Sequence, residues 1–281
     1  MIRLVHFLPS LDIGGAPINV MRVIKWHKKN NTKIQHIVCS PFNNLKMQKL
    51  FIKLGTELIE MPDIKNYLQL LRFIIKNLFL LKCDRSHKTL AILHGRGCGL
   101  LIKPLLTVLN FETVLFFRGY TPTYGLQNKF YAFIIRQYDK ILAKFGTCVA
   151  VGEDEITIIS KFLKPKKILK IRNPVPHIKW DYNKKDFKFD FGFVGRRSYQ
   201  KGFDRALRIS EENANKKFVW IGNIEGLQFS GVSIPKNLHI INYLPQEKIF
   251  NIVKVLICLS RWEGCSTIIS ESIQSKKPFL P

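Results

Sequence analysis

Short apolar runs alternate with longer segments of helical period along most of this 281-residue chain. Strand, helix and strand at this rhythm predict βαβ units, and therefore a parallel sheet with helices on both faces. In the first part of the chain we expect strands over Ile2–Leu8, Ile34–Cys39, Glu57–Glu60, Leu90–His94, Thr113–Arg118, Cys148–Val151 and Ile168–Ile171. The helices expected between them are Ile18–Asn30, Asn44–Leu54, Asn66–Lys82, Lys129–Phe145 and Asp154–Phe162.

The rhythm breaks after Asn173 and then restarts. Residues 174–188 contain prolines, aromatic residues and charges without a sustained period, so we interpret them as a crossover between two α/β domains, residues 1–173 and 189–281. The chain closes on Lys276–Pro281, which resembles the entry to one more strand, so we expect the second domain to be incomplete. The second domain should hold strands over Phe189–Val194, Lys217–Ile221, Leu238–Ile241 and Val255–Leu259, and helices over Asp204–Asn213, Pro245–Val253 and Ser266–Ser275.

Charge, targeting signals and cysteines restrict the partners and the compartment. The chain has 45 Lys and Arg against 20 Asp and Glu, a net charge of +25, which favours anionic partners such as phosphate groups, nucleic acid or an acidic membrane face. The longest apolar region, Tyr67–Leu81, carries Arg72 and Lys76 and is too short to span a bilayer, and no signal peptide is visible. The six cysteines show no Cys-x-x-Cys pair, and most lie in apolar surroundings, which predicts a cytoplasmic protein with buried thiols.

A Gly-Gly pair, Gly14 and Gly15, follows the first expected strand. Glycines at this turn let the backbone approach a ligand, and the next helix offers free N–H groups to a phosphate. The pair is not a Gly-x-Gly-x-x-Gly fingerprint, so a dinucleotide site is not indicated. A tight turn without a ligand is the alternative interpretation.

A cationic loop opens the second domain. After the strand ending at Val194 the chain reads Gly-Arg-Arg-Ser-Tyr-Gln-Lys-Gly over residues 195–202, and a helix follows. Ligands of open α/β sheets bind beyond the carboxyl ends of strands, where this loop lies. The fork of Arg196 and the compact charge of Lys201 suit a diphosphate. A solvated basic loop is the alternative.

Two carboxylates, Glu263 and Glu271, stand eight residues apart near the end of the chain. Glu263 belongs to the loop after a strand, and Glu271 lies inside the next helix, for which Ser266 is a plausible N-cap. The two could accept hydroxyl hydrogen bonds from a sugar and a ribose. By itself the pair is as consistent with surface charge as with a site.

In this order the three segments resemble the GT4-type retaining glycosyltransferases with the GT-B fold, in which two Rossmann-like domains face a cleft. The features that carry the resemblance are Gly14-Gly15, Gly195-Arg196 with Lys201-Gly202, and Glu263 to Glu271. Asn173-Pro174-Val175 and Val219–Gly222 agree as well. The similarity is sparse in the first half and dense from Phe191 onward.

The resemblance implies a nucleotide-sugar donor (UDP-, GDP- or ADP-linked) and a glycan or lipid-linked acceptor, with no cofactor and no metal. Arg196 and Lys201 would bind the diphosphate and stabilise the leaving nucleotide. Glu263 would hold the transferred sugar and Glu271 the ribose. The implied donor-binding set is Gly15, Arg196, Lys201, Glu263, Gly264 and Glu271, of which Arg196, Lys201 and Glu263 are catalytic.

Two departures from the family are visible. Where members often carry a first-domain histidine that contacts the sugar, residues 116–120 read Phe-Phe-Arg-Gly-Tyr, which makes Arg118 a candidate replacement. His94 is a second candidate, with a structural loop histidine as the alternative. Members also continue past the equivalent of Lys277-Pro278, which raises the alternative of a truncated, non-catalytic nucleotide-sugar-binding protein.

The expected helix Lys129–Phe145 is amphipathic and basic. Lys129, Arg136, Lys140 and Lys144 form one stripe, and Phe130, Ile134, Ile141 and Phe145 form another. Such a helix can lie on anionic lipid, or it can be an ordinary core helix with a solvated basic face. We therefore expect an enzyme of lipopolysaccharide or other surface polysaccharide synthesis, with peripheral attachment to the inner face of the membrane as a hypothesis. A nucleic-acid binder is supported by charge alone.

Overall fold

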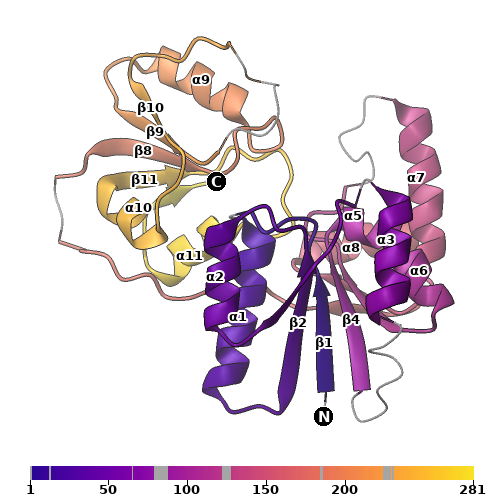
Figure 1. Ribbon diagram of the computed structural model, residues 1–281. Helices are drawn as coiled ribbons and strands as arrows, with labels where there is room; N and C mark the ends of the chain where they lie inside the picture. Colours follow the sequence, from indigo (N-terminus) through magenta and orange to yellow (C-terminus); the bar gives the residue numbers. More distant parts are fainter. Residues whose placement is uncertain are drawn as a thin grey trace. The chain divides into compact units, whose positions relative to one another are not determined.

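The computed structural model describes residues 2–12, 14–64, 66–78, 88–121, 128–183, 186–223, 229 and 231–281. They form two compact units, Met1–Pro174 and Val175–Pro281. Each unit is a parallel β-sheet with helices packed on it, so the chain has the expected α/β class (Figure 1).

The first unit is built on a seven-stranded sheet in the order β3-β2-β1-β4-β5-β6-β7, and every described strand pair in it is parallel. The chain first moves from β1 to β2 and β3, and then crosses back to place β4 on the other side of β1. The strands are β1 (Ile2–Phe7), β2 (Ile34–Ser40), β3 (Glu57–Glu60), β4 (Lys88–His94), β5 (Glu112–Phe116), β6 (Thr147–Ala150) and β7 (Ile168–Lys170).

Helices bury apolar side chains against both faces of this sheet. On one face Val20 of α1 and Phe51 of α2 pack with Val38 of β2. On the other face Leu70 of α3 and Ile159 of α8 belong to the larger core of the unit. The helices are α1 (Gly15–Lys29), α2 (Leu45–Lys53), α3 (Tyr67–Phe73), the π-helical turn η1 (Ile74–Leu78), α5 (Arg96–Leu101), α6 (Lys103–Val108), α7 (Lys129–Leu142) and α8 (Glu153–Leu163).

The second unit repeats the plan with a five-stranded parallel sheet in the order β10-β9-β8-β11-β12. Phe203 of α9 packs with Trp220 on one face, while Phe250 of α10 and Val219 belong to the core of the other face. The elements are β8 (Phe189–Val194), α9 (Phe203–Glu212), β9 (Phe218–Ile221), β10 (Leu238–Ile241), α10 (Gln246–Ile252), β11 (Val253–Ile257), α11 (Thr267–Gln274) and β12 (Phe279–Leu280).

The segment expected to be a crossover belongs in part to the second unit. Its Ile178 N–H donates to Ser275 Oγ at 2.7 Å, and Trp180 Nε1 donates to the Ser275 carbonyl at 2.8 Å. The Lys277 ammonium lies 4.0 Å from the centroid of the Trp180 ring and donates to the Phe250 carbonyl at 2.7 Å. These contacts tie the segment to the end of α11.

Some expected elements differ in the structure. We expected no helix between β4 and β5, yet α5 and α6 are there, because burial of Cys98 and Leu106 outweighs the weak helix propensity of Gly97, Gly99 and Pro104. The helix expected over Asn66–Lys82 is α3 followed by η1, and its residues 79–82 lie outside the described part of the chain, as does Cys83.

The free thiols of Cys39, Cys98 and Cys148 are buried, as their apolar surroundings predicted, and burial raises the pKa of each of these three thiols. No helix in the described ranges combines the length and the apolar character that crossing a bilayer requires.

Candidate functional site

The second sheet has a topological switch point between β8 and β11. From β8 the chain builds outward through β9 to β10, and it then places β11 on the other side of β8. The loops that follow β8 and β11 therefore leave the same edge of the sheet in opposite directions. Ligands of open parallel sheets bind in the crevice at this point. The Gly195–Gly202 loop and the loop over residues 258–266 are these two loops.

Close backbone packing fixes the start of the β8 loop. The Gly195 carbonyl accepts a hydrogen bond from Trp220 Nε1 at 2.8 Å. Gly222, with φ of 151°, lies so close that a β-carbon there would be 1.8 Å from the Gly195 oxygen. Arg197 N–H donates to the Asn223 carbonyl at 2.8 Å. The turn that presents Arg196 is therefore held by the end of β9.

The two loops are joined by an ion pair between the predicted site residues Lys201 and Glu263. Lys201 Nζ contacts Glu263 Oε1, and Ser260 Oγ donates to the same oxygen at 2.7 Å. Both charged side chains are about four-fifths buried. The structure thus brings together a cation and a carboxylate that are 62 residues apart in the sequence, at the switch point.

Backbone contacts reinforce this pairing. Arg261 N–H donates to the Gln200 carbonyl at 2.8 Å, and Gln200 Nε2 donates to the Trp262 carbonyl at 3.2 Å. Gly202, with φ of 75°, permits the close approach, since a β-carbon there would be 2.3 Å from the Leu259 oxygen. The glycine next to the predicted Lys201 is therefore required by the packing of one loop on the other.

A second ion pair braces the loops and was not predicted from the sequence. Arg261 donates to both carboxylate oxygens of Asp204, at 2.8 and 2.6 Å, and its guanidinium lies 3.6 Å from the centroid of the Tyr199 ring. The hydrogen bonds from Arg261 hold the pKa of Asp204 below its ordinary value. Asp204 in the first turn of a helix is the one local signal, and its partner lies 57 residues away.

The remaining predicted residues of this unit lie around the pair. Arg196 is exposed, and Gly264 is in the β11–α11 loop. Glu271 lies in the second turn of α11 with a side chain only 1% exposed. Ser266 is the N-cap residue of α11 and its side chain makes no cap hydrogen bond, so the first amides of this helix have no side-chain acceptor from it.

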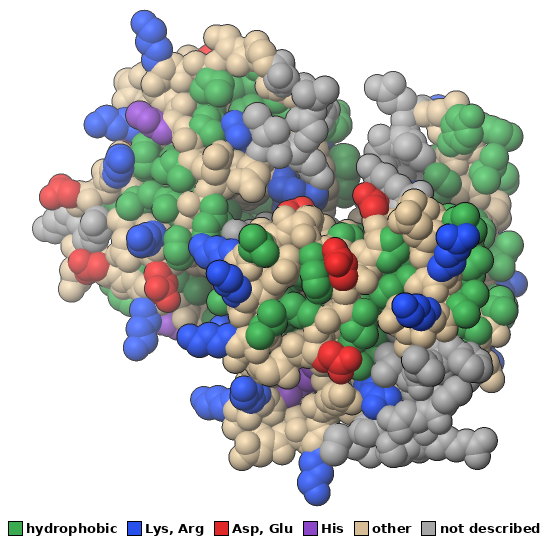
Figure 2. Space-filling view, in the orientation of Figure 1, with side chains coloured by type: hydrophobic (Ala, Val, Ile, Leu, Met, Phe, Trp, Pro, Cys, Tyr) green, Lys and Arg blue, Asp and Glu red, His purple; other side chains and the backbone are tan. Residues whose placement is uncertain are grey.

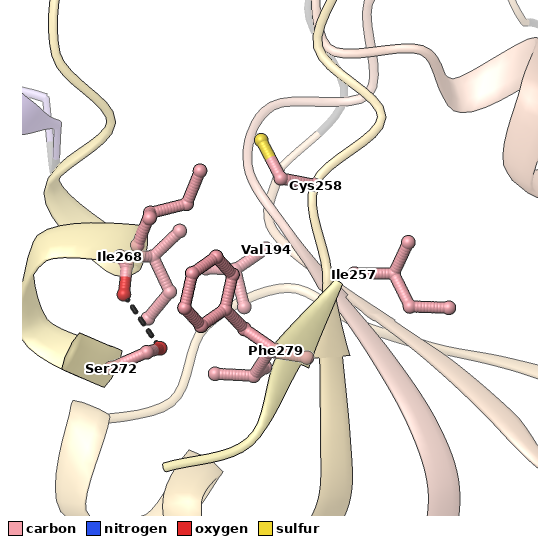
Figure 3. A pocket seen from close by; sticks show the side chains of 8 residues that line it. Val194, Ile257, Cys258, Ile268, Ser272 and Phe279 are labelled. Atoms are coloured by element: carbon pink, nitrogen blue, oxygen red, sulfur yellow. Dashed lines mark hydrogen bonds between the residues drawn. The ribbon is translucent and has the colours of Figure 1, made fainter. Parts of the chain in front are cut away.

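A shallow apolar recess lies beside α11 at the ends of β8 and β11. Figure 3 shows Ile268 and Phe279 gathered there with Val194, and Ser272 Oγ donating to the Ile268 carbonyl at 2.8 Å. None of the described residues that line the recess is charged. Its chemistry does not suit a diphosphate, which separates it from the Lys201–Glu263 pair.

The first unit holds the other three predicted residues. Gly15 is the first residue of α1, and Gly14 before it is an N-cap without a side chain to accept a hydrogen bond. His94 is buried at the end of β4, and Arg118, with φ of 56°, follows β5. Arg118 Nε and Nη2 lie 3.3 and 3.1 Å from His94 Nδ1, and Nη1 donates to Asn173 Oδ1 at 2.9 Å. The structure therefore brings His94 and Arg118 together.

Buried Glu155 of α8 fixes the loop that carries Arg118. Its carboxylate accepts backbone N–H donors from Gly119 at 2.5 Å, from Tyr120 at 2.9 Å and from Val151 at 2.7 Å. Three charge-assisted hydrogen bonds of this kind hold a loop strongly. Burial, opposed by the Glu155 charge, lowers the pKa of Arg118 to about 10, so its guanidinium stays positive at neutral pH.

Two units with parallel, Rossmann-like sheets match the layout of the GT-B fold, and the solved structures with similar folds include glycosyltransferases. Sucrose-phosphate synthase from Thermosynechococcus elongatus matches 99% of this chain and 80% of its own at a TM-score of 0.73 and 9% identity. Anabaena HepE, solved in complex with UDP, has the same coverage, with a TM-score of 0.69 and 12% sequence identity. The lipopolysaccharide outer core galactosyltransferase WaaB also has this coverage, with a TM-score of 0.60 and 17% sequence identity.

Sequence comparison is less informative. No family model matches the chain. An uncharacterized 42.6 kDa protein in the cps region of Klebsiella pneumoniae is 26% identical over 92 residues, which are 32% of this chain. The match spans a quarter of the length of that curated relative.

Proposed function

We propose that this protein is a glycosyltransferase that moves a sugar from a nucleoside-diphosphate donor to a glycan or lipid-linked acceptor with retention of configuration. The observation that carries the proposal is the Lys201–Glu263 pair at the switch point of the second sheet. It supplies a cation and a hydrogen-bonding carboxylate where parallel sheets of this kind bind their ligands. The GT-B fold and the UDP bound to HepE support the same reading.

The proposed roles follow from charge and position. Arg196 and Lys201 bind the diphosphate, and Glu263 accepts hydroxyl hydrogen bonds from the transferred sugar. Lys201 can exchange the Glu263 carboxylate for a phosphate oxygen, because both are anionic acceptors for one ammonium. That exchange frees Glu263 for the sugar. Glu271 holds the ribose, and the backbone amides around Gly264 offer further hydrogen bonds to the nucleotide sugar.

The proposed chemistry is electrostatic. As the bond from the sugar to the diphosphate breaks, negative charge grows on the departing oxygen, and preorganised cations there lower the barrier. Arg196 and Lys201 provide those charges, so the reaction as proposed uses neither a metal nor another cofactor. In a retaining reaction on one face of the sugar, the departing phosphate oxygen takes the proton of the acceptor hydroxyl. No protein base is then required.

Donor binding and turnover test this function. A thermal-shift screen with UDP-, GDP- and ADP-sugars should give one stabilising class, since a ligand that binds only the folded state raises the unfolding temperature. Donor hydrolysis or transfer with that class should be lost in Arg196→Ala and Lys201→Ala. Lys248→Ala, an exposed lysine of α10, is the matched control and should keep wild-type turnover. Unchanged rates in the first two variants would refute the assigned roles.

Two other readings predict different results from the same screen. A non-catalytic nucleotide-sugar-binding protein would be stabilised by a donor without turning it over. A nucleic-acid binder would ignore nucleotide sugars and bind oligonucleotides with a steep dependence on salt.

We further propose that α7 docks the protein on the inner, anionic face of the cell membrane. The apolar stripe of this helix is exposed rather than part of the core: Phe130, Ile134 and Ile141 are 67%, 46% and 57% exposed. Figure 2 shows hydrophobic side chains gathered over α7 at the right edge of the view. Further exposed apolar side chains on or beside the helix are Tyr131, Phe133, Tyr138 and Phe145.

A lipid surface fits this helix better than an apolar protein groove because of its charge. Lys129 and Lys144 are exposed at its two ends, and the chain carries +25 in total. Aromatic side chains beside lysines are typical of helices that lie in the interface of anionic bilayers. A protein with a lipid-linked acceptor would gain access to that acceptor in this way.

Flotation with liposomes tests the docking. Binding should be strong to vesicles with anionic lipid, weak to neutral ones, and reduced by salt. Ile141→Asp should lower the bound fraction severalfold. Ile52→Asp on α2 is the matched control, since Ile52 is equally exposed at 61% but lies on another helix. Equal loss in both variants, or no salt-sensitive binding, would remove the idea.

A further inference from the structure

Four histidines of the first unit form one hydrogen-bonded row. His27 is in the last turn of α1, His36 on β2, His6 on β1 and His94 at the end of β4. His27 Nδ1 lies 2.8 Å from His36 Nε2. His36 Nδ1 lies 3.0 Å from His6 Nε2, and His6 Nδ1 lies 3.1 Å from His94 Nε2. Each link therefore joins an Nε2 to an Nδ1.

The sheet register explains how the row forms. β2, β1 and β4 are adjacent parallel strands (Figure 1). His36 pairs with Leu4 of β1, two residues before His6, and His6 pairs with Ile92 of β4, two residues before His94. Steps of two residues keep all three histidines on one face of the sheet. The row thus rises across the sheet towards the carboxyl ends of the strands.

The rings meet by their edges. The planes of His6 and His36 differ by 15°, and those of His6 and His94 by 17°, with centroids 5.3 and 5.4 Å apart. Nearly parallel rings whose nitrogens are much closer than their centres lie side by side rather than face to face. This arrangement suits N–H···N hydrogen bonds.

Arg118 sets the direction of every bond in the row. An arginine only donates, so the Nδ1 of His94, which receives Arg118 Nε and Nη2, carries no proton. A neutral His94 is then protonated at Nε2 and donates to His6. The same reasoning makes His6 donate to His36 and His36 to His27. All four imidazoles are then Nε2–H tautomers, and His94, His6 and His36 each donate to the next ring, away from Arg118.

The surroundings keep the row uncharged. Burial, followed by the repulsion that a protonated His36 and the charged Arg118 would exert, lowers the pKa of His6 to about 3, and burial lowers that of His36 to about 4. Burial and the charge of Arg118 also lower the pKa of His94. Glu155, which anchors the Arg118 loop, is a further charged group that acts on Arg118.

A metal does not explain the row. No three His, Cys, Asp or Glu side chains in the described part of the chain are grouped as a metal site. Three hydrogen bonds between neutral rings, together with the donors of Arg118, satisfy both ring nitrogens of His94, His6 and His36.

We propose that His27, His36, His6 and His94 are positioning residues, a directional hydrogen-bond chain that holds the Arg118 guanidinium at the carboxyl edge of the first sheet. This role rests on the proposed function, together with the expectation from the sequence that Arg118 replaces a histidine that contacts the sugar. The chain itself is a property of the fold. Because Arg118 and a proton compete for His94 Nδ1, the row keeps that nitrogen as an acceptor and fixes two of the arginine's nitrogens.

The tautomers test the chain by ¹⁵N NMR of the imidazoles in the full-length protein. At pH 7 all four rings should show a protonated Nε2 and an unprotonated Nδ1. In Arg118→Met the donor that sets the direction is gone, so each ring should become a mixture of tautomers, including His27 at the far end. Arg118→Lys restores a donor-only side chain and should restore the single tautomer. Arg22→Met is the control and should leave the spectrum of the row unchanged.

Two results would overturn the proposal. One is an Nδ1–H tautomer or a charged imidazole in the row of the wild-type protein at pH 7. The other is a His27 signal that is the same in the wild type and in Arg118→Met. The wild-type spectrum alone decides the first point, so the test does not depend on a variant folding.

The link to function is tested by cutting the row in the middle. His6→Phe fills the space but neither donates nor accepts, whereas the amide of His6→Gln can accept from His94 and donate to His36. We expect His6→Phe to lower kcat/KM at least tenfold and His6→Gln to recover most of that loss. Equal activity in both variants contradicts a positioning role. If the wild-type protein transfers no sugar, the proposed function fails, and the NMR result still decides the chain.

Discussion

Replacing Gly202 by alanine should pull apart the two loops of the candidate site. An alanine at φ of 75° has the unfavourable left-handed conformation, which costs about 1 kcal/mol. Its β-carbon would also lie 2.3 Å from the Leu259 oxygen and 2.9 Å from the Leu259 β-carbon. The loops must move by about 1 Å to reach the 3.4 Å of ordinary contact. Such overpacking typically costs ~1–3 kcal/mol, so the loss of unfolding free energy should be about 3 kcal/mol.

Urea denaturation and nucleotide binding together measure this effect. Gly231→Ala is the matched control, because Gly231 has φ of 78° but no atom of the described residues lies within 4 Å of its would-be β-carbon. It should lose only about 1 kcal/mol, for the conformation alone. Gly202→Ala should in addition weaken nucleoside-diphosphate binding, since Lys201 and Glu263 separate. An equal loss of stability in the two variants, with binding intact in Gly202→Ala, would refute the reasoning.

Three further predictions concern the rest of the molecule. The side chain of Lys103 is fully buried, and its Nζ has no hydrogen-bond partner among the described residues. Lys103→Met should therefore raise the unfolding free energy by about 1 kcal/mol or more. A lower urea midpoint in the variant would contradict this. The pKa of His6 is about 3 in the folded protein and 6.5 in the unfolded chain, so the unfolded chain binds a proton first as the pH falls. Below pH 6.5 the unfolding free energy should therefore decrease, by about 2 kcal/mol at pH 5 for this residue alone. Urea midpoints that do not change between pH 7 and pH 5 would contradict this. Arg261→Met should leave Asp204 without its ion-pair partner, lower the urea midpoint of unfolding modestly and weaken diphosphate binding. Unaltered binding would show that the Arg261–Asp204 ion pair does not hold the two loops in place.

Much of the fold was predictable because each strand is a compact apolar run. β3, β8 and β10 have the expected bounds, and the other expected strands differ by one or two residues at one or both ends. The π-helical turn after α3 was not predictable, since periodicity does not distinguish it from an α-helix. α5 and α6 were missed because Gly97, Gly99 and Pro104 disfavour a helix locally, and packing that is invisible in the sequence decides the outcome.

The candidate site was predictable where the chemistry is local. Arg196 and Lys201 stand in one loop after a strand, so their shared position follows from the sequence. The ion pair of Lys201 with Glu263 was not predictable, because it joins loops 62 residues apart. Likewise His6 is one polar residue in an apolar strand, which by itself predicts nothing. Its partners on β2 and β4 become neighbours only through the strand order.

Calorimetric titration of the wild-type protein and of Lys201→Ala with UDP, GDP and ADP tests the central claim most directly. Our account predicts that one nucleoside diphosphate binds the wild-type protein, that its monophosphate binds at least tenfold more weakly, and that Lys201→Ala loses the difference between them. Binding of none of the diphosphates to the folded wild-type protein, or equal binding by the variant, would contradict it.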